Sequence, residues 1–183
     1  PFTNAGNGTL TISSGNLDIT NAFTQSGQLV LAGGGVNATS GLTNYGTLRG
    51  SGNVSLGAAT FTNEGIVSPG GAGNLGTLNI VGHYAQTANG TLAIDIPTAV
   101  SRDVLNVTGN VSLAGNLSVT LGYAESASDK HNFLNYAVSG RTGNFGSVTG
   151  AGNLPLAFKD AAGKAYLGST AKTWDGGGGG NTS

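Results

Sequence analysis

The sequence predicts an all-β fold, a right-handed single-stranded parallel β-helix (β-solenoid) with a C-terminal hairpin-rich cap or spacer. Three observations predict it. Short segments alternate apolar and polar residues at period two, no helical pattern separates them, and corner residues recur at short intervals. Such frequent corners favour stacked coils of three short strands over strands joined by hairpins. An antiparallel sandwich remains the alternative, because the repeat lengths are uneven.

The most frequent segment reads Gly, any residue, Leu or Val, any residue, and then Ile, Leu or Val. Its copies begin at Gly8, Gly15, Gly27, Gly52, Gly76, Gly90, Gly109 and Gly115, and a variant begins at Asp103. Each copy is expected to be a strand with one buried face, since side chains alternate across a strand. We expect the leading glycine to take the positive φ that a tight corner demands.

A second marker is an aromatic residue or Leu followed by Thr-Asn-x-Gly, and it occurs at residues 2–6, 42–46 and 61–65. Together the two markers place residues 1–121 in roughly five or six β-solenoid coils of about 20 residues each. The end coils of such a rod expose unpaired strand edges, so we expect caps or neighbouring coils to cover them.

The pattern loosens after Leu121. Residues 122–170 contain a charged loop and longer, more aromatic strand-like pieces, which predict a cap or a continuation of the solenoid. Residues 171–183 include five consecutive glycines. They are predicted to be a flexible tail or the truncated start of a next module, because they cannot bury enough surface to fold alone.

The composition excludes several classes of partner. Charged residues make up 8% of the chain, and the net charge is −1. Nucleic acid is excluded as a partner, because its binding needs clustered cations and only seven scattered Lys and Arg residues are present. No apolar run approaches the roughly 20 residues that span a bilayer, so we expect no direct membrane insertion of this segment. The lack of Cys excludes disulfides, thiol catalysis and Cys-based zinc sites. The chain begins at Pro1 without a signal peptide, and we expect it to be part of a longer protein.

Two stretches carry a family resemblance. Residues 66–86 follow the pattern SPG…GTLxIxGxYxQ, and residues 90–117 follow GTLxIxI…sDxLxVtGxxxLxGxL. Both are similar to elements of type V secretion passenger domains, those of autotransporters and filamentous-haemagglutinin-like adhesins. Residues 134–167 resemble the segment that follows these elements, with SGxxGxF at 139–145. Residues 174–176 resemble the opening of another module.

The resemblance implies a right-handed β-helix that is exported and held outside the cell, on the surface of a Gram-negative bacterium. It implies adhesion, aggregation, biofilm formation or simple spacing. The implied partners are host-cell or bacterial surface glycans or proteins, or further copies of the chain. No protease or lipase module is recognisable, so we predict a non-enzymatic segment of a secreted surface adhesin or its structural stalk. The alternatives are a carbohydrate-active enzyme on a β-helix scaffold and a passive spacer.

The glycines of residues 71–76 match G-x-G-x-x-G, and Asp95 follows at a distance along the chain that suits dinucleotide-binding sites. Such a site needs a helix after the glycines, whereas residues 77–81 alternate like a strand. We therefore predict a glycine corner and assign no cofactor. The same glycines are similar to a calcium-binding nonapeptide repeat, but Leu75 stands where that repeat has aspartate, so no metal site is assigned.

His83 and His131 are the only two imidazoles of the chain. Either histidine could serve in a Ser-His-Asp triad, since the order of the triad members varies between folds. No Gly-x-Ser-x-Gly segment surrounds a candidate serine, however. His83 follows a corner glycine and His131 lies in a charged loop, so both are predicted to face solvent, and no catalytic residue is assigned.

An enzyme on this scaffold needs clustered carboxylates. Asp18, Asp95 and Asp103 are far apart in the sequence, although stacked coils can align two of them. Asp103 is predicted to bond the backbone of a corner, and Arg102 is predicted to pair with a neighbouring acid. The enzymatic alternative therefore depends on Asp95 and Asp103.

Glycosylation and ice binding are weighed on two further patterns. Asn-x-Ser/Thr sites occur at Asn7, Asn37, Asn53, Asn89, Asn106, Asn110, Asn116 and Asn181. Turn asparagines followed by outward Thr or Ser create such sites by composition alone, so no modification is predicted. Ice-binding solenoids display regular Thr-x-Thr arrays, but Thr9-x-Thr11 and Thr60-x-Thr62 are isolated pairs. The stacked, regular Thr-x-Thr array that ice binding needs is therefore not predicted.

Overall fold

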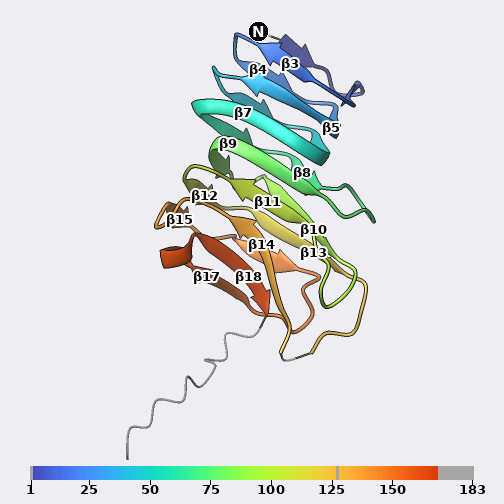
Figure 1. The fold of residues 1–183 in the computed structure, drawn as a ribbon, viewed down its shortest axis with the longest axis vertical. Helices are drawn as coiled ribbons and strands as arrows, with labels where there is room; N and C mark the ends of the chain where they lie inside the picture. The colour runs from blue at the N-terminus through green and yellow to red at the C-terminus, as the bar shows by residue number, and fades with distance from the viewer. Residues whose placement is uncertain (1, 127, 169–183) are drawn as a thin grey trace, which may run out of the picture.

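The computed structural model describes residues 2–126 and 128–168, and these residues form the predicted parallel β-solenoid (Figure 1). The chain winds around a common axis and contributes three short strands to each turn, one to each of three stacks. Within a stack, a strand pairs in parallel with the strand one turn later. The tail predicted at residues 171–183 lies outside the described residues.

The three stacks are named here by their strands. Stack A holds β2 (Thr9–Ile12), the start of β5 (Gln28–Ala38), the start of β7 (Thr47–Asn63), β8 (Ile66–Pro69), β10 (Thr91–Ile96), β13 (Asn116–Leu121) and β16 (Ser147–Thr149). Stack B holds β3 (Asn16–Ile19), the end of β5, the middle of β7, the start of β9 (Thr77–Gln86), β11 (Val104–Val107) and β14 (Lys130–Asn135). Stack C holds β1 (Phe2–Asn4), β4 (Phe23–Gln25), β6 (Leu42–Asn44), the ends of β7 and β9, β12 (Val111–Leu113) and β15 (Arg141–Gly143).

The turns lengthen along the rod. The chain enters stack A at positions that pair in register from turn to turn: Thr9, Gln28, Thr47, Ile66, Thr91, Asn116 and Ser147. The first three intervals between these positions are equal, the next two are longer and equal to each other, and the last is the longest. Much of the extra length lies in the loops of residues 70–76 and 97–103 and in residues 122–126 and 128–129, which all lie between stack A and stack B. Figure 1 shows these loops together on one side of the rod, and we call them the loop ridge.

Aliphatic and aromatic side chains fill the axis of the rod, as the alternating pattern predicts. Leu29, Leu48, Val67, Leu92 and Leu117 follow one another in register in stack A and are all buried. Burial of each such side chain stabilises the fold by about 1.5–3 kcal/mol. The core is therefore a continuous column rather than a separate cluster in each turn.

Aromatic side chains form a second column in stack C. Phe61 and Tyr84 stack with ring centroids 5.8 Å apart, and Phe2 meets Phe23 edge to face at 5.3 Å. This column explains the aromatic or Leu position of the Thr-Asn-x-Gly marker, because that residue points toward the axis of the rod in the turns that carry the marker.

The Asn of that marker also points inward, which the sequence analysis did not predict. Gln25, Asn44, Asn63 and Gln86 are buried in register, and we call them, with Asn4 above them, the amide column. The Nδ2 group of Asn44 donates to Oδ1 of Asn63 at 2.9 Å and to the carbonyl of Ile66 at 3.0 Å. These amides thus bond one turn to the next, which offsets the cost of burying a polar group.

The glycines that lead the strand motif are mostly needed for close approach and not for positive φ, so that part of the prediction was wrong. Among these motif glycines, only Gly15 and Gly115 have positive φ. A Cβ atom at Gly27 would lie 2.2 Å from the carbonyl oxygen of Gly8, one turn earlier. The corners of the Thr-Asn-x-Gly marker are as tight, since a Cβ atom at Gly46 would lie 2.0 Å from the carbonyl oxygen of Gly27. Stacked corners leave no room for a side chain there.

The C-terminal end is closed by a hairpin, as predicted. Parallel stacking continues to β16, and then β17 (Leu156–Lys159) and β18 (Lys164–Gly168) pair antiparallel around the short 3-10 helix η1 (Asp160–Ala162). β18 also pairs antiparallel with β14 and so covers the last strand of stack B. At the other end, none of the described residues covers the first turn, and Phe2 is 43% exposed.

Among the described residues, no helix is both long and apolar enough to cross a membrane.

Candidate functional site

A groove of about 380 Å³ crosses the outer face of stack C and is the candidate binding site. It spans β7, β9 and β12 and the corner that leads into β15. Its polar side chains come from four successive turns: Thr60, His83, Asn110, Ser112, Ser139 and Thr142. Of the described residues that line this groove, none is Asp, Glu, Lys or Arg. The groove therefore offers hydroxyl, amide and imidazole groups to a ligand, and its described lining contributes no permanently charged side chain.

The groove forms where a column of outward hydroxyls is interrupted. Thr3, Thr24, Thr43 and Thr62 lie in register on stack C, and the positions after them are Ala85, Ser112 and Thr142. We call this series the hydroxyl column. The column consists of single threonines brought into register by the parallel pairing, and the Thr-x-Thr pairs at Thr9 and Thr60 are not stacked on further such pairs. The smaller side chain of Ala85 leaves the hollow.

His83 has one ring nitrogen directed at the scaffold. Its Nδ1 atom accepts a hydrogen bond from the backbone N–H of Asn110 at 3.0 Å. In a neutral ring, Nε2 then carries the proton and is a donor. The partly exposed position of His83 agrees with the prediction that it faces outward. His83 thus gives the groove a donor whose orientation is fixed by the backbone.

The C-terminal wall of the groove is held in a strained conformation. Ser139 has φ of 56°, and it is the one described residue other than glycine with positive φ. Its backbone N–H donates to the carbonyl of Asp160 at 2.9 Å, and the N–H of Gly140 donates to the carbonyl of Ala137 at 2.8 Å. Residues in such conformations persist only where the surroundings hold them, and they are frequent at binding sites.

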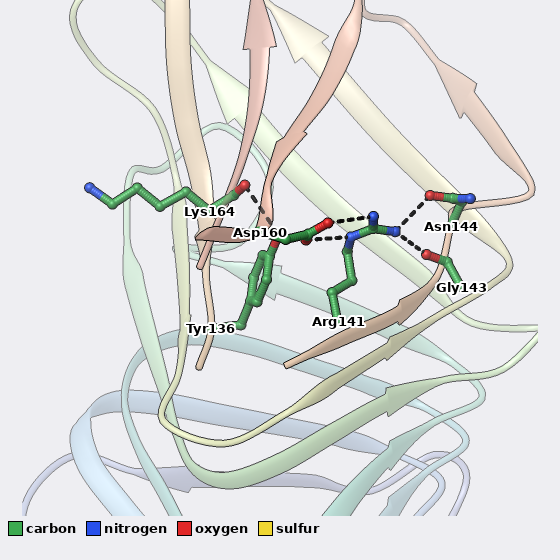
Figure 2. A network of polar contacts seen from close by, with 6 residues as sticks. All are labelled: Tyr136, Arg141, Gly143, Asn144, Asp160 and Lys164. Carbon is green, nitrogen blue, oxygen red and sulfur yellow. Dashed lines mark hydrogen bonds and ion pairs between the residues drawn. The ribbon is translucent and has the colours of Figure 1, made fainter. Parts of the chain in front are cut away.

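Figure 2 shows the network that holds this wall. Arg141 donates from Nε to Oδ1 of Asp160 at 2.8 Å and from Nη2 to Oδ2 at 2.9 Å, a two-point ion pair. The hydroxyl of Tyr136 donates to the same Oδ1 at 2.6 Å. The guanidinium also stacks over the ring of Phe158 at 4.0 Å. The cap is therefore fastened to the turn that ends the groove.

The charges of this network reinforce one another. The hydrogen bonds from Arg141 and from Tyr136 lower the pKa of Asp160 to about 2. Burial and the nearby carboxylate raise the pKa of the Tyr136 hydroxyl. Both groups consequently keep one protonation state over the ordinary pH range.

The G-x-G-x-x-G segment is a corner of the loop ridge, as predicted. Strand β9 follows this corner, and two carboxylates bind the backbone of the corner. Oδ2 of Asp95 accepts from the N–H of Gly73 at 2.6 Å, and Oδ1 of Asp103 accepts from the N–H of Gly76 at 2.8 Å. The other oxygen of Asp103 accepts from the N–H of Asp95 at 3.0 Å. The prediction that Asp103 bonds a corner backbone is confirmed.

The loop ridge thus brings Asp95 and Asp103 together, but not as an open pair. Asp103 is fully buried, and burial raises the pKa of its carboxyl to about 7 despite the two backbone donors. Asp18 lies at the other end of the rod, where Oδ1 accepts from Asn37 at 2.5 Å beside a second groove of about 310 Å³. Across the described residues, no group of three or more His, Cys, Asp or Glu side chains is placed to hold a metal ion.

Two predictions about charged residues were wrong. His131 is 0% exposed, because β18 pairs over β14 and covers it, whereas the sequence suggested a loop residue in solvent. Arg102 does not pair with an acid among the residues that the structure describes. Its Nε donates to the backbone carbonyl of Asn132 at 2.9 Å, across one turn of the rod. The error at His131 follows from the cap, whose position the sequence pattern did not define, and the error at Arg102 follows from the stacking of β14 on the turn before it.

Several asparagines that match the glycosylation pattern are used by the scaffold. On the outer face of stack B, Asn79 donates to Asn53 at 2.9 Å and Asn106 donates to Asn79 at 2.9 Å. Asn135 continues this ladder by donating to Asn106 at 2.7 Å. These side chains stabilise neighbouring turns, and nothing distinguishes them as acceptors of a glycan.

The sequence patterns named His83 as a triad candidate, Thr60 in a Thr-x-Thr pair and Asn110 as a glycosylation match, but did not predict the groove that joins them. Ser112, Ser139 and Thr142 lie in turns of different length, so no fixed period relates them to Thr60. These residues come together only in the folded rod. Comparison of the chain with known protein families, with curated proteins and with solved structures finds no match to any of them.

Proposed function

We propose that this chain is a non-enzymatic segment of a secreted bacterial surface adhesin, of the type V secretion passenger class, and that it binds a neutral surface glycan through the groove on stack C. Its place would be outside a Gram-negative cell. The proposal rests on the resemblance of residues 66–117 to passenger elements and on the chemistry of the groove.

The observation that carries the proposal is the uncharged, hydrogen-bonding lining of a groove on a rigid rod. Binding sites combine a concave surface with a few well-placed polar groups. Here His83 supplies an oriented N–H, and Ser112 and Thr142 supply hydroxyls on successive strands. The backbone of these strands is paired within the stack, so little conformational entropy is lost when a ligand binds.

The test fills the groove without disturbing the core. Ser112→Tyr adds a large side chain at an exposed position of the hydroxyl column inside the groove. Thr24→Tyr makes the same addition in the same column, outside the groove. We expect the wild-type chain and T24Y to bind members of a panel of neutral oligosaccharides and S112Y to bind them at least tenfold more weakly.

Two outcomes would contradict this expectation. Equal binding by S112Y and T24Y would place any ligand elsewhere on the rod. No binding by the wild type to the panel or to bacterial and host cells would favour a passive spacer.

The enzymatic alternative is less well supported, because Asp103 is buried and both Asp95 and Asp103 already accept backbone hydrogen bonds. It is tested on the same panel by following the release of reducing ends. Turnover by the wild type that is abolished in Asp95→Asn would replace the adhesin proposal by a carbohydrate-active enzyme.

A further inference from the structure

The loop ridge and the cap meet at a buried imidazole. His131 lies on β14, the strand of stack B on which the cap is built, and it pairs in register with Leu167 of β18. Its side chain is fully buried. The antiparallel pairing of β14 with β18 and this imidazole therefore occupy the same place in the fold.

The hydrogen bonds around His131 engage one ring nitrogen and leave the other without a partner. Its Nε2 atom lies 2.7 Å from the hydroxyl oxygen of Tyr123, and that hydroxyl donates to Oδ2 of Asp129 at 2.8 Å. Because the phenol gives its single proton to the carboxylate, Nε2 must carry the proton that it donates to the phenol oxygen. Nδ1 is buried without a hydrogen-bond partner among the described residues, and in a neutral ring it is the nitrogen that carries no proton.

A proton on Nδ1 would consequently add a buried positive charge that has no acceptor. Such a group costs several kcal/mol in general unless the structure opens to water. The charged and titratable groups around His131 come from the loop ridge, from β14 and from β18: Tyr123, Glu125, Asp129, Arg102, Lys130, Tyr166 and Lys164.

These groups act in opposite directions and do not compensate the charge. Burial lowers the pKa of His131 and Arg102 lowers it further, while Asp129 raises it. Asp129 reaches the ring only through Tyr123, and its carboxylate also accepts from the N–H of Ser126 at 2.7 Å. Lys130 is directed at the ring of Tyr166, 4.6 Å from its centroid.

We propose that His131 is an acid-sensitive latch, whose protonation releases the β17–β18 hairpin from β14 and uncovers the edge of the last strand of stack B. This inference does not depend on the proposed function. It adds a regulated edge to the rod, since an unpaired strand edge is a surface on which another chain can pair.

The sign of the effect follows from the lowered pKa of His131. The unfolded imidazole takes up its proton near pH 6.5, whereas the docked one resists it. The stability that the neutral ring gives to the cap is therefore full above the unfolded pKa and falls as the pH drops below it. Asp103 acts oppositely, because its pKa is raised to about 7 and its burial costs stability as the pH rises toward that value. Asp160, with a pKa of about 2, keeps its charge in mild acid.

The test measures hydrogen exchange of the cap amides at pH 7.5 and pH 5.0, corrected for the intrinsic rate. In the wild type we expect the amides of β17 and β18 to exchange at least tenfold faster at pH 5.0, with the amides of β5 and β7 unchanged. His131→Gln retains a neutral donor and should abolish the difference. His83→Gln removes the other imidazole of the chain and should leave the difference intact.

An equal cap exchange rate at the two pH values in the wild type would overturn the proposal, and so would a full acid response in H131Q. If H131Q does not form the cap, the protonation state of His131 in the wild-type protein provides the test instead. Nitrogen chemical shifts of His131 should show a neutral ring in every molecule whose cap is docked. A charged ring in a docked cap at pH 5.0 contradicts the latch.

Discussion

The two halves of the rod are built on the same stacks but hold their turns together differently. In residues 9–69, turns of equal length leave short corners, and glycine and amide columns fit one turn to the next. In residues 70–168, the turns are longer, and the loop ridge and the cap add carboxylates, imidazole, arginine and tyrosine. The regular half serves to align one turn with the next. The irregular half contains most of the side chains whose charge can change with pH.

The largest loss of stability is expected from a substitution at a glycine corner of the regular half. Gly46→Ala places a Cβ atom against the carbonyl oxygen of Gly27, which belongs to the stacked backbone and cannot move aside. We expect the free energy of unfolding to fall by about 3 kcal/mol, as for severe overpacking. Denaturant unfolding measures it. The control is Gly6→Ala, where nothing lies within 4 Å of the added atom and φ is not positive. A loss as large in G6A as in G46A would mean that corner packing is not the cause.

A smaller loss is expected from the amide column. Asn63→Leu keeps the approximate size of the side chain but removes the donor to the carbonyl of Thr91, at 3.1 Å, and the acceptor for Asn44. We expect about 2 kcal/mol of destabilisation, because buried polar groups are left without partners. The matched control, Asn79→Leu, breaks a similar ladder on the outer face, where water replaces the amide, and should change stability by less than about 0.5 kcal/mol. Equal losses in the two variants would show that burial of the column is unimportant.

The sequence predicted the parts of this molecule that depend on period. Val54, Leu78 and Leu117 alternate with polar residues, and that alternation alone predicts their burial in stacked strands. Asp103 was also interpreted correctly, because an acid beside a corner has backbone donors within reach. The predicted reason for the motif glycines was wrong, since close approach between turns depends on which corner lies above which.

The parts that were missed depend on contacts between turns of unequal length. Asn63 reads as a turn residue until the register of stack C shows it facing inward. His131 reads as a loop residue because its cover, β18, lies far along the chain and follows a whole further turn of the rod. The groove joins Thr60 to Ser112 and Thr142 across loops whose lengths no pattern fixes. Local pattern thus predicts the stacks, and only the assembled rod defines the groove and the latch.

We infer that the first turns of the rod are interchangeable units of equal length, stacked in parallel register. Deleting residues 42–60, one complete turn, joins Gly41 to Phe61 and leaves each stack with a matching strand. Deleting residues 42–51 removes part of a turn and shifts every later strand off its stack. Circular dichroism and denaturant unfolding of both shortened chains test the claim directly. We expect a cooperatively unfolding β structure for the full-turn deletion and loss of that structure for the part-turn deletion. Loss of structure in both, or native-like folding of both, would contradict it.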